Sequence, residues 1–392
     1  MNEMQKELND YGIQVHTHPA EIAAAAWDQL LAQQDCPTPF MQHAYLQAMH
    51  ESGSATPDSG WTPRFITLWV NDALVAACPM YLKKHSYGEY VFDWAWANAY
   101  QQHGLPYYPK ALIAVPFTPV PGSRLLAVDA PTRQRLLQAV IAWCAQEKLS
   151  SLHLLFGSPA DMAACEAEEL LQRQTVQFHW HNQAWPDFEA FLASLNQEKR
   201  KKIRQERRKV AEAGVTFRWS LGAAISSSDW RFFYECYERT YLEHGNAPYL
   251  TPAFFQSMQT DMAHNWLLFI AERDGVPMAS SLIGIHHLGE ADAVAYGRYW
   301  GALERVDCLH FEACYYQPLQ WCMQHGVQRF EGGAQGEHKM ARALMPTSTH
   351  SGHWLADHRF AQAVAEFLER EGRGVDNYMA HLDERNPFKR PD

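Results

Sequence analysis

The sequence has 392 residues, of which 47% are hydrophobic and 20% are charged, and its formal net charge is −11. This length predicts two domains rather than one, with enough apolar residues for a core. The negative charge argues against a protein that coats nucleic acid, although it leaves room for a local basic patch. No apolar run approaches the roughly 20 residues that a membrane span requires. The N-terminus has no apolar signal region, so we expect a cytoplasmic protein.

The cysteines and histidines do not predict a metal site. The eight cysteines are scattered without a Cys-x-x-Cys pair, which is typical of reduced, buried thiols. The spacing of His350, His353 and His358, and that of His179 and His181, fits no zinc pattern. We therefore expect no metal.

The first half of the chain begins with two predicted helices, residues 22–31 and 40–49, and a hairpin over residues 64–82. An aromatic and proline-rich loop, residues 93–122, precedes an amphipathic helix at 131–148 and a buried strand at 152–156. A loop of this length is usually functional, and aromatic walls with a few charges suit a pocket for a sugar, a peptide or an acyl chain. The alternative is that these side chains only pack the loop onto its domain. The candidate substrate-binding residues are Asp93, Tyr107, Tyr108, Lys110 and Arg124.

The second half repeats this order of elements. Helices are predicted over residues 230–237 and 249–258, a hairpin over 267–285, a strand over 296–300, a helix over 309–325 and a strand over 327–331. Corresponding helices also share a Trp-Cys pair, at Trp143-Cys144 and Trp321-Cys322. The matched order predicts a tandem repeat of one α+β unit. We expect units over residues 1–185 and 215–392, joined by a basic helix within 186–214.

The joining helix is strongly basic, since eight of the eleven residues 199–209 are Lys or Arg. Such a helix suits the phosphates of an aminoacyl-tRNA, or an anionic membrane surface or diphosphate-linked precursor. It also suits a solvated connecting helix that binds nothing. We expect Lys199, Lys202 and Glu206 on one face, and Ile203 and Val210 on another. The candidate nucleic-acid- or phosphate-binding residues are Lys199, Arg200, Lys202, Arg204, Arg207 and Arg208.

A polar, glycine-broken loop over residues 332–342 carries an acid, an imidazole and an amine in consecutive positions. N-acyl transfer needs a base for the attacking amine and a donor to the oxyanion. Glu337 and His338 are the candidate bases, and Lys339 or Arg342 is suited to holding a phosphate or polarising a carbonyl. The alternative is a solvated loop without a special role.

The strand before this region alternates Tyr296, Arg298 and Trp300 on one face. Tyr296 and Arg298 are candidate substrate-binding residues, and the alternative is an ordinary strand with its aromatic residues in the core. Glu331, at the end of the next strand, is a further candidate base. Its alternative role is that of a carboxylate paired with Arg329 or Arg342.

These motifs are similar to the Fem-type peptidyltransferases, and more closely to the FemAB-like family of peptidoglycan biosynthesis or recognition proteins. The residues similar to the broader group are Ala213-Gly214-Val215, Pro318-Leu319-Gln320-Trp321 leading to His325-Gly326, and Phe330-Glu331-Gly332-Gly333. Those that resemble the narrower family are Gln335-Gly336-Glu337-His338-Lys339, Tyr107-Tyr108-Pro109-Lys110, Pro116-Phe117-Thr118-Pro119 and Arg124. The resemblance covers the chain from about Phe40 to the C-terminus.

The resemblance implies an α+β fold of two tandem GNAT-like units, with a cleft walled by the loops at 93–124 and 331–342. In such a fold the strand at Tyr296 offers N–H groups to the oxyanion. It also implies an N-acyltransferase whose acceptor is an amine, such as that of a peptidoglycan precursor.

The donor is left open between two classes. Fem enzymes use aminoacyl-tRNA, which would make tRNA a partner, and GNAT enzymes use acyl-CoA. The chain lacks the Gln/Arg-x-x-Gly-x-Gly/Ala loop for the coenzyme pyrophosphate and has Gly301 to Asp307 there instead. A second hypothesis is a non-catalytic module that binds a glycopeptide or nucleic acid.

Overall fold

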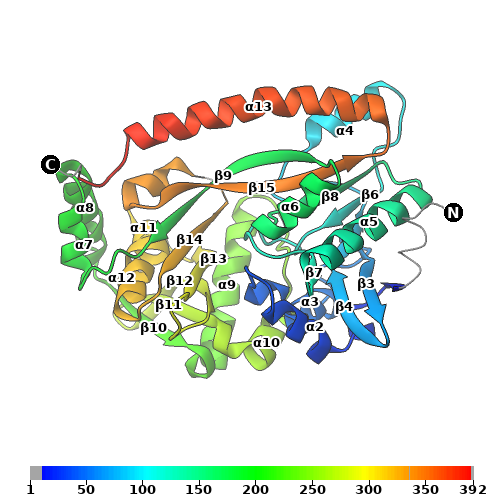
Figure 1. The fold of residues 1–392 in the computed structure, drawn as a ribbon. Coiled ribbons are helices and arrows are strands. Elements are labelled where there is room, and N and C mark those ends of the chain that lie inside the picture. The colour runs from blue at the N-terminus through cyan, green and yellow to red at the C-terminus, as the bar shows by residue number, and fades with distance from the viewer. Residues whose placement is uncertain (1–10, 335, 390–392) are drawn as a thin grey trace. The chain divides into compact units, whose positions relative to one another are not determined.

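The computed structural model describes residues 11–334 and 336–389 (Figure 1). Residues 1–10, Gln335 and residues 390–392 lie outside the described residues. The expectation that there is no signal region rests partly on residues 1–10. The chain divides into two compact units. Unit 1 is Met1–Thr175 with Ser348–Asn377, and unit 2 is Val176–Thr347 with Tyr378–Asp392. Among the described residues, no helix is both long and apolar enough to cross a bilayer.

Unit 1 has two groups of strands. The first has the order β1-β3-β4-β7 and is antiparallel. The second has the order β15-β8-β6-β5-β2, in which β6 and β8 run parallel and the other pairs antiparallel. The strands are β1 (Gly12–His16), β2 (Trp61–Pro63), β3 (Phe65–Val70), β4 (Ala73–Cys78), β5 (Met80–Lys83), β6 (Lys110–Ile113), β7 (Leu126–Ala127) and β8 (Ser151–Leu155). The helices are α2 (Ala24–Ala32), α3 (His43–Glu51), α4 (Trp94–Gln102), α5 (Ala130–Gln146) and α6 (Pro159–Ala167).

Unit 2 has strands in the order β10-β11-β12-β13-β14-β9, in which β13 and β14 run parallel and the other pairs antiparallel. The strands are β10 (Val215–Leu221), β11 (Trp266–Arg273), β12 (Val276–His286), β13 (Val294–Ala302) and β14 (Arg329–Ala334). The helices are α7 (Phe188–Ser194), α8 (Gln197–Glu212), α9 (Ser227–Glu243), α10 (Pro252–Asp261), α11 (Leu309–Phe311) and α12 (Gln317–Gln324). Three elements run from one unit into the other: β9 (Leu171–His181), β15 (Met345–Leu355) and α13 (His358–Glu384).

The predicted tandem repeat is visible in the order of elements. Each unit contains a parallel strand pair joined through helix: β6, α5 and β8 in unit 1, and β13, α11 to α12 and β14 in unit 2. Strand β9 follows the first repeat but pairs with β14, and β15 follows the second but pairs with β8. The division into units therefore differs from the predicted ranges 1–185, 186–214 and 215–392. The exchanged strands bring residues 348–377 into unit 1, and the basic helix packs into unit 2.

The helices of both units present apolar faces to their cores. In α5, Leu136, Val140 and Cys144 follow each other at intervals of four residues and are buried against the sheet strands. Asp129 caps this helix by accepting a 2.8 Å hydrogen bond from the main-chain N–H of Thr132. The core of unit 2 is formed by β9, β11 to β14, α7, α8 and the segment from the π-helical turn to α12.

Two predicted elements differ in detail from the structure. The helix over residues 309–325 is present, but a π-helical turn, η5 (Glu312–Tyr316), separates α11 from α12. Pro318 has no N–H, and its ring would clash with the carbonyl of Cys314, so a wider turn relieves the helix. The predicted loop over residues 93–122 contains α4 and β6. Helix α4 forms because Trp96 and Tyr100 lie one turn apart and pack with Tyr107 in a buried cluster.

Candidate functional site

The parallel strands β13 and β14 of unit 2 diverge after three residue pairs. They pair over Val294–Tyr296 and Arg329–Glu331. In the diverging part of β13, Arg298 is the extra residue of a β-bulge against β12. Bulges are frequent next to active sites, where they redirect a side chain. A cavity of about 120 Å³ lies here, lined by Ser281, Gly297, Arg298, Tyr299, Trp300, His310, Cys314, Tyr315, Phe330 and Gly332.

Two glycines allow close packing around this cavity. A Cβ atom at Gly301 would lie 1.9 Å from the carbonyl oxygen of Cys236 in α9. A Cβ atom at Gly332 would lie 2.6 Å from Cδ2 of Leu344. Neither distance is compatible with a real contact, so a side chain at either position would force its neighbour, α9 or Leu344, to shift.

The segment from α11 to the π-helical turn brings His310, Cys314 and Tyr315 to the cavity. The hydroxyl of Tyr315 lies 3.3 Å from Nε2 of His338, a residue of the 3-10 helix η6 (Glu337–Arg342). Burial lowers the pKa of His310 to about 4 and raises the pKa of Cys314 to about 12. Burial and the neighbouring cationic side chains also lower the pKa of His338. At pH 7 the thiol is therefore protonated, and His338 is a neutral imidazole that can accept a proton.

Glu337 does not join this site. Its carboxylate accepts hydrogen bonds from the hydroxyl of Tyr378 at 2.9 Å and from Arg385 at 3.2 Å, and it does not line the cavity. Of the two candidate bases on η6, His338 is the one that contacts a cavity residue.

Lys339 is buried, contrary to the idea of an exposed cation that holds a phosphate. Its Nζ donates to the carbonyl oxygens of Gly333 at 3.1 Å and Ala334 at 3.2 Å. Burial lowers its pKa to about 8. Lys339 therefore links the end of β14 to η6. Because its pKa is about 8, a large fraction of its amine is uncharged at mildly alkaline pH.

Arg342 is also committed within the fold. Its guanidinium lies 2.8 and 2.9 Å from the two carboxylate oxygens of Glu206 in α8. It also donates to the carbonyl oxygen of His338 at 2.6 Å, and Tyr316 donates its hydroxyl hydrogen to Glu206. Because Arg342 is only 2% exposed, it is unsuited to direct substrate binding and instead holds η6 against α8.

The predicted faces of α8 are wrong in one respect. Glu206 lies on the buried face with Ile203 and Val210, not with Lys199 and Lys202. Residues 203, 206 and 210 are three and four positions apart and therefore share a face. A buried carboxylate is acceptable there because Arg342 neutralises it.

Glu331 is buried and engaged in a pair. Its Oε1 accepts a 2.9 Å hydrogen bond from Nε of Arg329, and its Oε2 lies 4.0 Å from Nε2 of His179. Burial lowers the pKa of His179 to about 3, so that ring is neutral. The alternative role of Glu331, a carboxylate paired with Arg329, is confirmed.

The candidates on β13 take different positions. Tyr296 is buried at the last paired position and does not line the cavity. Arg298 lines the cavity from the bulge, and its guanidinium donates to the hydroxyl of Tyr299 at 3.1 Å. Trp300 is half-buried and also lines the cavity. Arg298 is thus the one predicted substrate-binding residue that the structure places in the cavity wall.

In unit 1, four of the five candidates belong to one buried hydrogen-bond network. Lys110 donates to Asp93, to Glu89 at 2.7 Å and to Ser86 at 2.8 Å. Tyr107 donates to Asp93 at 2.6 Å. Tyr108 joins the network through its 2.8 Å hydrogen bond with Ser86. Arg124 lies apart from the network, with its main-chain N–H bonded to Asp161 at 2.7 Å.

The network in unit 1 contains a charged pair and a second acid that is about half ionised at pH 7. Although burial opposes its ionisation, the ammonium group of Lys110 holds the pKa of Asp93 well below its usual range. Burial raises the pKa of Glu89 to about 7. One carboxylate oxygen of each acid is buried without a hydrogen-bond partner among the described residues. These groups fasten the segment before α4 to β6; direct substrate binding by them, and a cleft shared with the loop at 331–342, stay predictions.

The basic helix α8 pairs some of its charges within unit 2. Arg207 lies 3.0 Å from the buried Glu312, and Arg204 lies 2.5 Å from Glu189. Lys199 pairs with the exposed Glu198 at 3.1 Å. The remaining candidates on this helix, Lys202, Arg208 and Arg200, are exposed or half-exposed. The binding of a phosphate or nucleic acid by this helix stays a prediction.

Sequence reasoning missed Ser281, Cys314 and Tyr315 as cavity residues. Cys314 and Tyr315 reach the cavity from the π-helical turn, and Ser281 reaches it from the middle of β12. Pro318 was the available signal for the irregular turn, because a proline in the interior of a helix disturbs the preceding turn.

The fold resembles solved structures at low sequence identity. The structure of FemX matches with a TM-score of 0.52 and 10% identity, over 88% of this chain and 98% of that chain. L-PGS from Bacillus licheniformis matches with a TM-score of 0.53 and 10% identity, over 91% and 99%. A tandem GNAT protein from the clavulanic acid biosynthesis pathway gives a TM-score of 0.47 and 11% identity, over 88% and 99%. No curated protein sequence matches. The predicted class, a tandem GNAT-like α+β fold of Fem type, is confirmed.

A family model gives the broadest match in sequence. The family is described as FemAB-like, peptidoglycan biosynthesis/recognition, and its model matches residues 18–390. This range includes both units and every candidate residue discussed above. The chain therefore belongs to the FemAB-like family.

Proposed function

We propose that the protein is an N-acyltransferase that moves an acyl or aminoacyl group onto an amine, and that the reaction takes place at the cavity between β13 and β14. The observation that supports this proposal most directly is that the two strands diverge around a cavity. Tyr315, in the wall of this cavity, contacts the neutral imidazole of His338. The family description supports an acceptor in peptidoglycan biosynthesis, and the amine of a precursor peptide fits that description.

The chemistry requires a base and a donor to an oxyanion. The amine nitrogen attacks the carbonyl carbon of the donor and must lose a proton, which Tyr315 and His338 are placed to relay out of the cavity. Beyond Tyr296 the main chain of β13 is no longer paired with β14. Main-chain N–H groups of this part of β13 are therefore suited to donate hydrogen bonds to the developing oxyanion. The C=O bond then re-forms as the bond from this carbon to the leaving group breaks. The thiol of coenzyme A or the ribose hydroxyl of tRNA is released, taking up the proton that the amine gave up.

A wider groove next to the cavity suits the donor. Its volume is about 710 Å³, and it shares Trp300 and His310 with the cavity wall. Arg305 lines this groove and is exposed, whereas Arg239 is paired with Glu243 at 2.8 Å and Glu304 also lines the groove. The exposed guanidinium of Arg305 suits a donor that carries phosphate. Both acyl-CoA and aminoacyl-tRNA meet this condition, so both remain candidate donors.

The test is a transfer assay with a nucleotide-linked peptidoglycan precursor as acceptor and either an acyl-CoA or charged tRNA as donor. We expect His338→Gln and Tyr315→Phe each to lower kcat/KM by about 10²-fold or more, the usual contribution of a proton-transfer group. Glu337→Gln is the matched control: it changes the adjacent residue of η6, but its contacts are with Tyr378 and Arg385. The proposal is refuted if the wild-type protein transfers with neither donor, or if all three variants transfer equally well.

The second candidate function is a module that binds a glycopeptide or nucleic acid without chemistry. Two buried groups that could have acted on a substrate are already engaged: Glu331 by Arg329, and Lys339 by the carbonyl oxygens of Gly333 and Ala334. This favours a function without chemistry. A precursor that binds to wild type and to His338→Gln with equal affinity, without any transfer, would support this function.

A further inference from the structure

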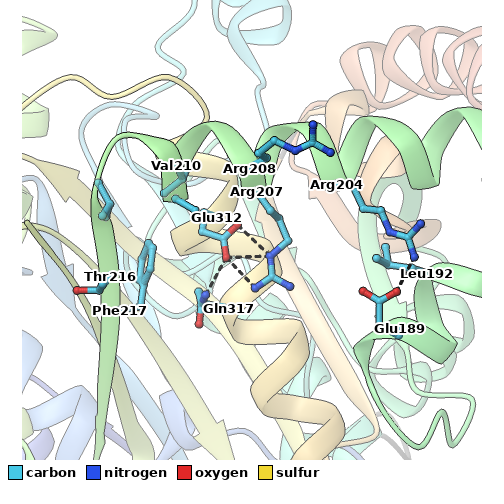
Figure 2. Close-up of a pocket in the computed structure, with 12 residues that line it drawn as sticks. Glu189, Leu192, Arg204, Arg207, Arg208, Val210, Thr216, Phe217, Glu312 and Gln317 are labelled. Atoms are coloured by element: carbon cyan, nitrogen blue, oxygen red, sulfur yellow. Dashed lines mark hydrogen bonds and ion pairs between the residues drawn. The ribbon is translucent and has the colours of Figure 1, made fainter.

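A second hollow in unit 2 lies along the basic helix α8. Its volume is about 630 Å³, within the range of about 300–1,000 Å³ that is typical of small-molecule sites. It shares no lining residue with the cavity between β13 and β14. Figure 2 shows its walls, to which α7, α8, β10, η5 and α12 contribute: Glu189, Leu192, Arg204, Arg207, Arg208, Val210, Ala211, Val215, Thr216, Phe217, Glu312 and Gln317.

One of the three arginines that line this groove, Arg207, is engaged by a buried carboxylate of the protein. Glu312 is 3% exposed, and its Oε1 accepts a 2.7 Å hydrogen bond from the side chain of Gln317. Arg207 lies 3.0 Å from the same carboxylate (Figure 2). It also donates to Gln320 at 3.1 Å. The charges of Arg207 and Glu312 therefore cancel, and the pair forms a rigid, neutral part of the wall.

The other two arginines are available to a ligand. Arg204 and Arg208 are four residues apart on α8, so their side chains leave the helix on the same face. Among the described residues, Arg204 forms an ion pair only with Glu189, which also lines the groove. Both side chains are more than half exposed, so water screens this pair. Arg208 is exposed, and no described carboxylate forms an ion pair with it. Guanidinium groups bind phosphoryl oxygens through paired N–H donors, and Arg204 and Arg208 offer two such groups from successive turns of one helix.

The wall beyond the Arg207–Glu312 pair is mostly apolar, with Thr216 as its polar residue. Val210, Val215 and Phe217 line the groove beyond the Arg207–Glu312 pair. In Figure 2, Val210 and Phe217 lie toward one end of the groove, and Arg204 lies toward the other. A ligand that contacts both the arginine end and the apolar end of the groove must carry an anionic group and an apolar or aromatic group on one molecule.

We propose that this groove is a binding site for an organic phosphate or diphosphate ester. Its phosphoryl oxygens bind Arg204 and Arg208, and its organic group lies against Val210 and Phe217. A prenyl diphosphate and a nucleoside diphosphate share this chemistry. The site goes beyond the proposed acyl transfer, and neither proposal depends on the other.

The experiment is isothermal titration calorimetry of the full chain with geranyl diphosphate, uridine diphosphate and inorganic pyrophosphate. Arg204→Gln/Arg208→Gln removes both guanidinium groups. Lys202→Gln/Lys209→Gln is the matched control, because it removes two positive charges from the same helix at positions that do not line the groove. Phe217→Ala tests the apolar end. All five side chains are at least partly exposed, so the variants should fold, as circular dichroism will verify.

We expect saturable binding of at least one ester, weakened tenfold or more in the double arginine variant and less than threefold in the double lysine control. Phe217→Ala should weaken the ester at least threefold and leave pyrophosphate unchanged. Whether the prenyl or the uridine compound binds then identifies the source of the phosphate. The proposal is overturned if neither ester binds, if both double variants weaken binding equally, or if pyrophosphate binds as tightly as the esters.

Discussion

Replacing Glu206 by glutamine should destabilise unit 2 far more than the loss of a surface ion pair does. Glu206 accepts from Arg342 at 2.8 and 2.9 Å and from the hydroxyl of Tyr316. Arg342 is 2% exposed and its guanidinium carbon lies 3.4 Å from the ring centroid of Phe311. Glutamine keeps the shape but not the charge, so it leaves a buried guanidinium without a counterion.

The expected magnitude follows from this burial. Removing one partner of a buried pair costs about 3–5 kcal/mol in the free energy of unfolding. The matched control is Glu198→Gln on the same helix: this side chain is 81% exposed and pairs with Lys199 at 3.1 Å. Exposed pairs contribute about 0–1 kcal/mol. The double variant Glu206→Leu/Arg342→Met should recover much of the loss, because it leaves no uncompensated charge.

Urea unfolding of these four proteins, together with the single variants Glu206→Leu and Arg342→Met, measures these differences. Because Arg342 also donates to the carbonyl of His338, Glu206→Gln should in addition lower transfer activity at temperatures where the protein stays folded. The reasoning is refuted if Glu206→Gln and Glu198→Gln cost the same, or if the double variant is as unstable as the sum of its single variants.

Three further predictions concern buried groups. The pKa of Lys339 is lowered from 10.5 to about 8 in the folded protein. Between these two pH values the unfolded chain binds more protons than the folded chain. The free energy of unfolding should therefore rise with pH across this window, by about 3 kcal/mol. Lys339→Met should remove this rise in urea unfolding at several pH values; equal slopes for both proteins would contradict it. Gly301→Ala should lower the free energy of unfolding by more than about 3 kcal/mol, because its Cβ would lie 1.9 Å from the carbonyl oxygen of Cys236. A melting temperature within about two degrees of that of wild type would correspond to a loss on the order of 1 kcal/mol or less, and would contradict this packing. Lys110→Met should cost about 3–5 kcal/mol, because it leaves two buried carboxylates without their cation, whereas the exposed Lys84→Met should change stability little.

The repeat and its order of elements were accessible from the sequence, because the hydrophobic periodicity of each helix and hairpin is a local property. The exchange of β9 and β15 between the repeats was not. A strand shows which of its faces is buried but not which partner strand it pairs with, and the pairing of Ser351 with Leu155 joins positions about two hundred residues apart. The predicted unit boundaries differ from the structure for this reason.

Burial of charges was the second property that the sequence did not disclose. Arg342 and Lys110 were predicted to bind substrate, and in the structure each neutralises an acid from a distant segment, Glu206 and Asp93 respectively. A basic residue near a glycine-rich loop suits either a ligand or an internal carboxylate. The choice depends on whether a carboxylate is brought within about 3 Å by the fold, and no local pattern contains that information.

The fate of Glu337, His338 and Lys339 shows why a consecutive motif is a poor guide to a site. In a 3-10 helix successive side chains point about 120° apart, so three adjacent polar residues cannot converge on one reacting group. Accordingly Glu337 contacts Tyr378, His338 contacts Tyr315, and Lys339 points to the main chain of Gly333. Convergence in this protein comes instead from residues five apart in the sequence, His310 and Tyr315, which the π-helical turn brings to one cavity. Candidate reacting groups should therefore be sought among side chains that share a cavity wall. This criterion selects Tyr315, and it reaches His338, which does not line the cavity, only through the contact of His338 with the hydroxyl of Tyr315.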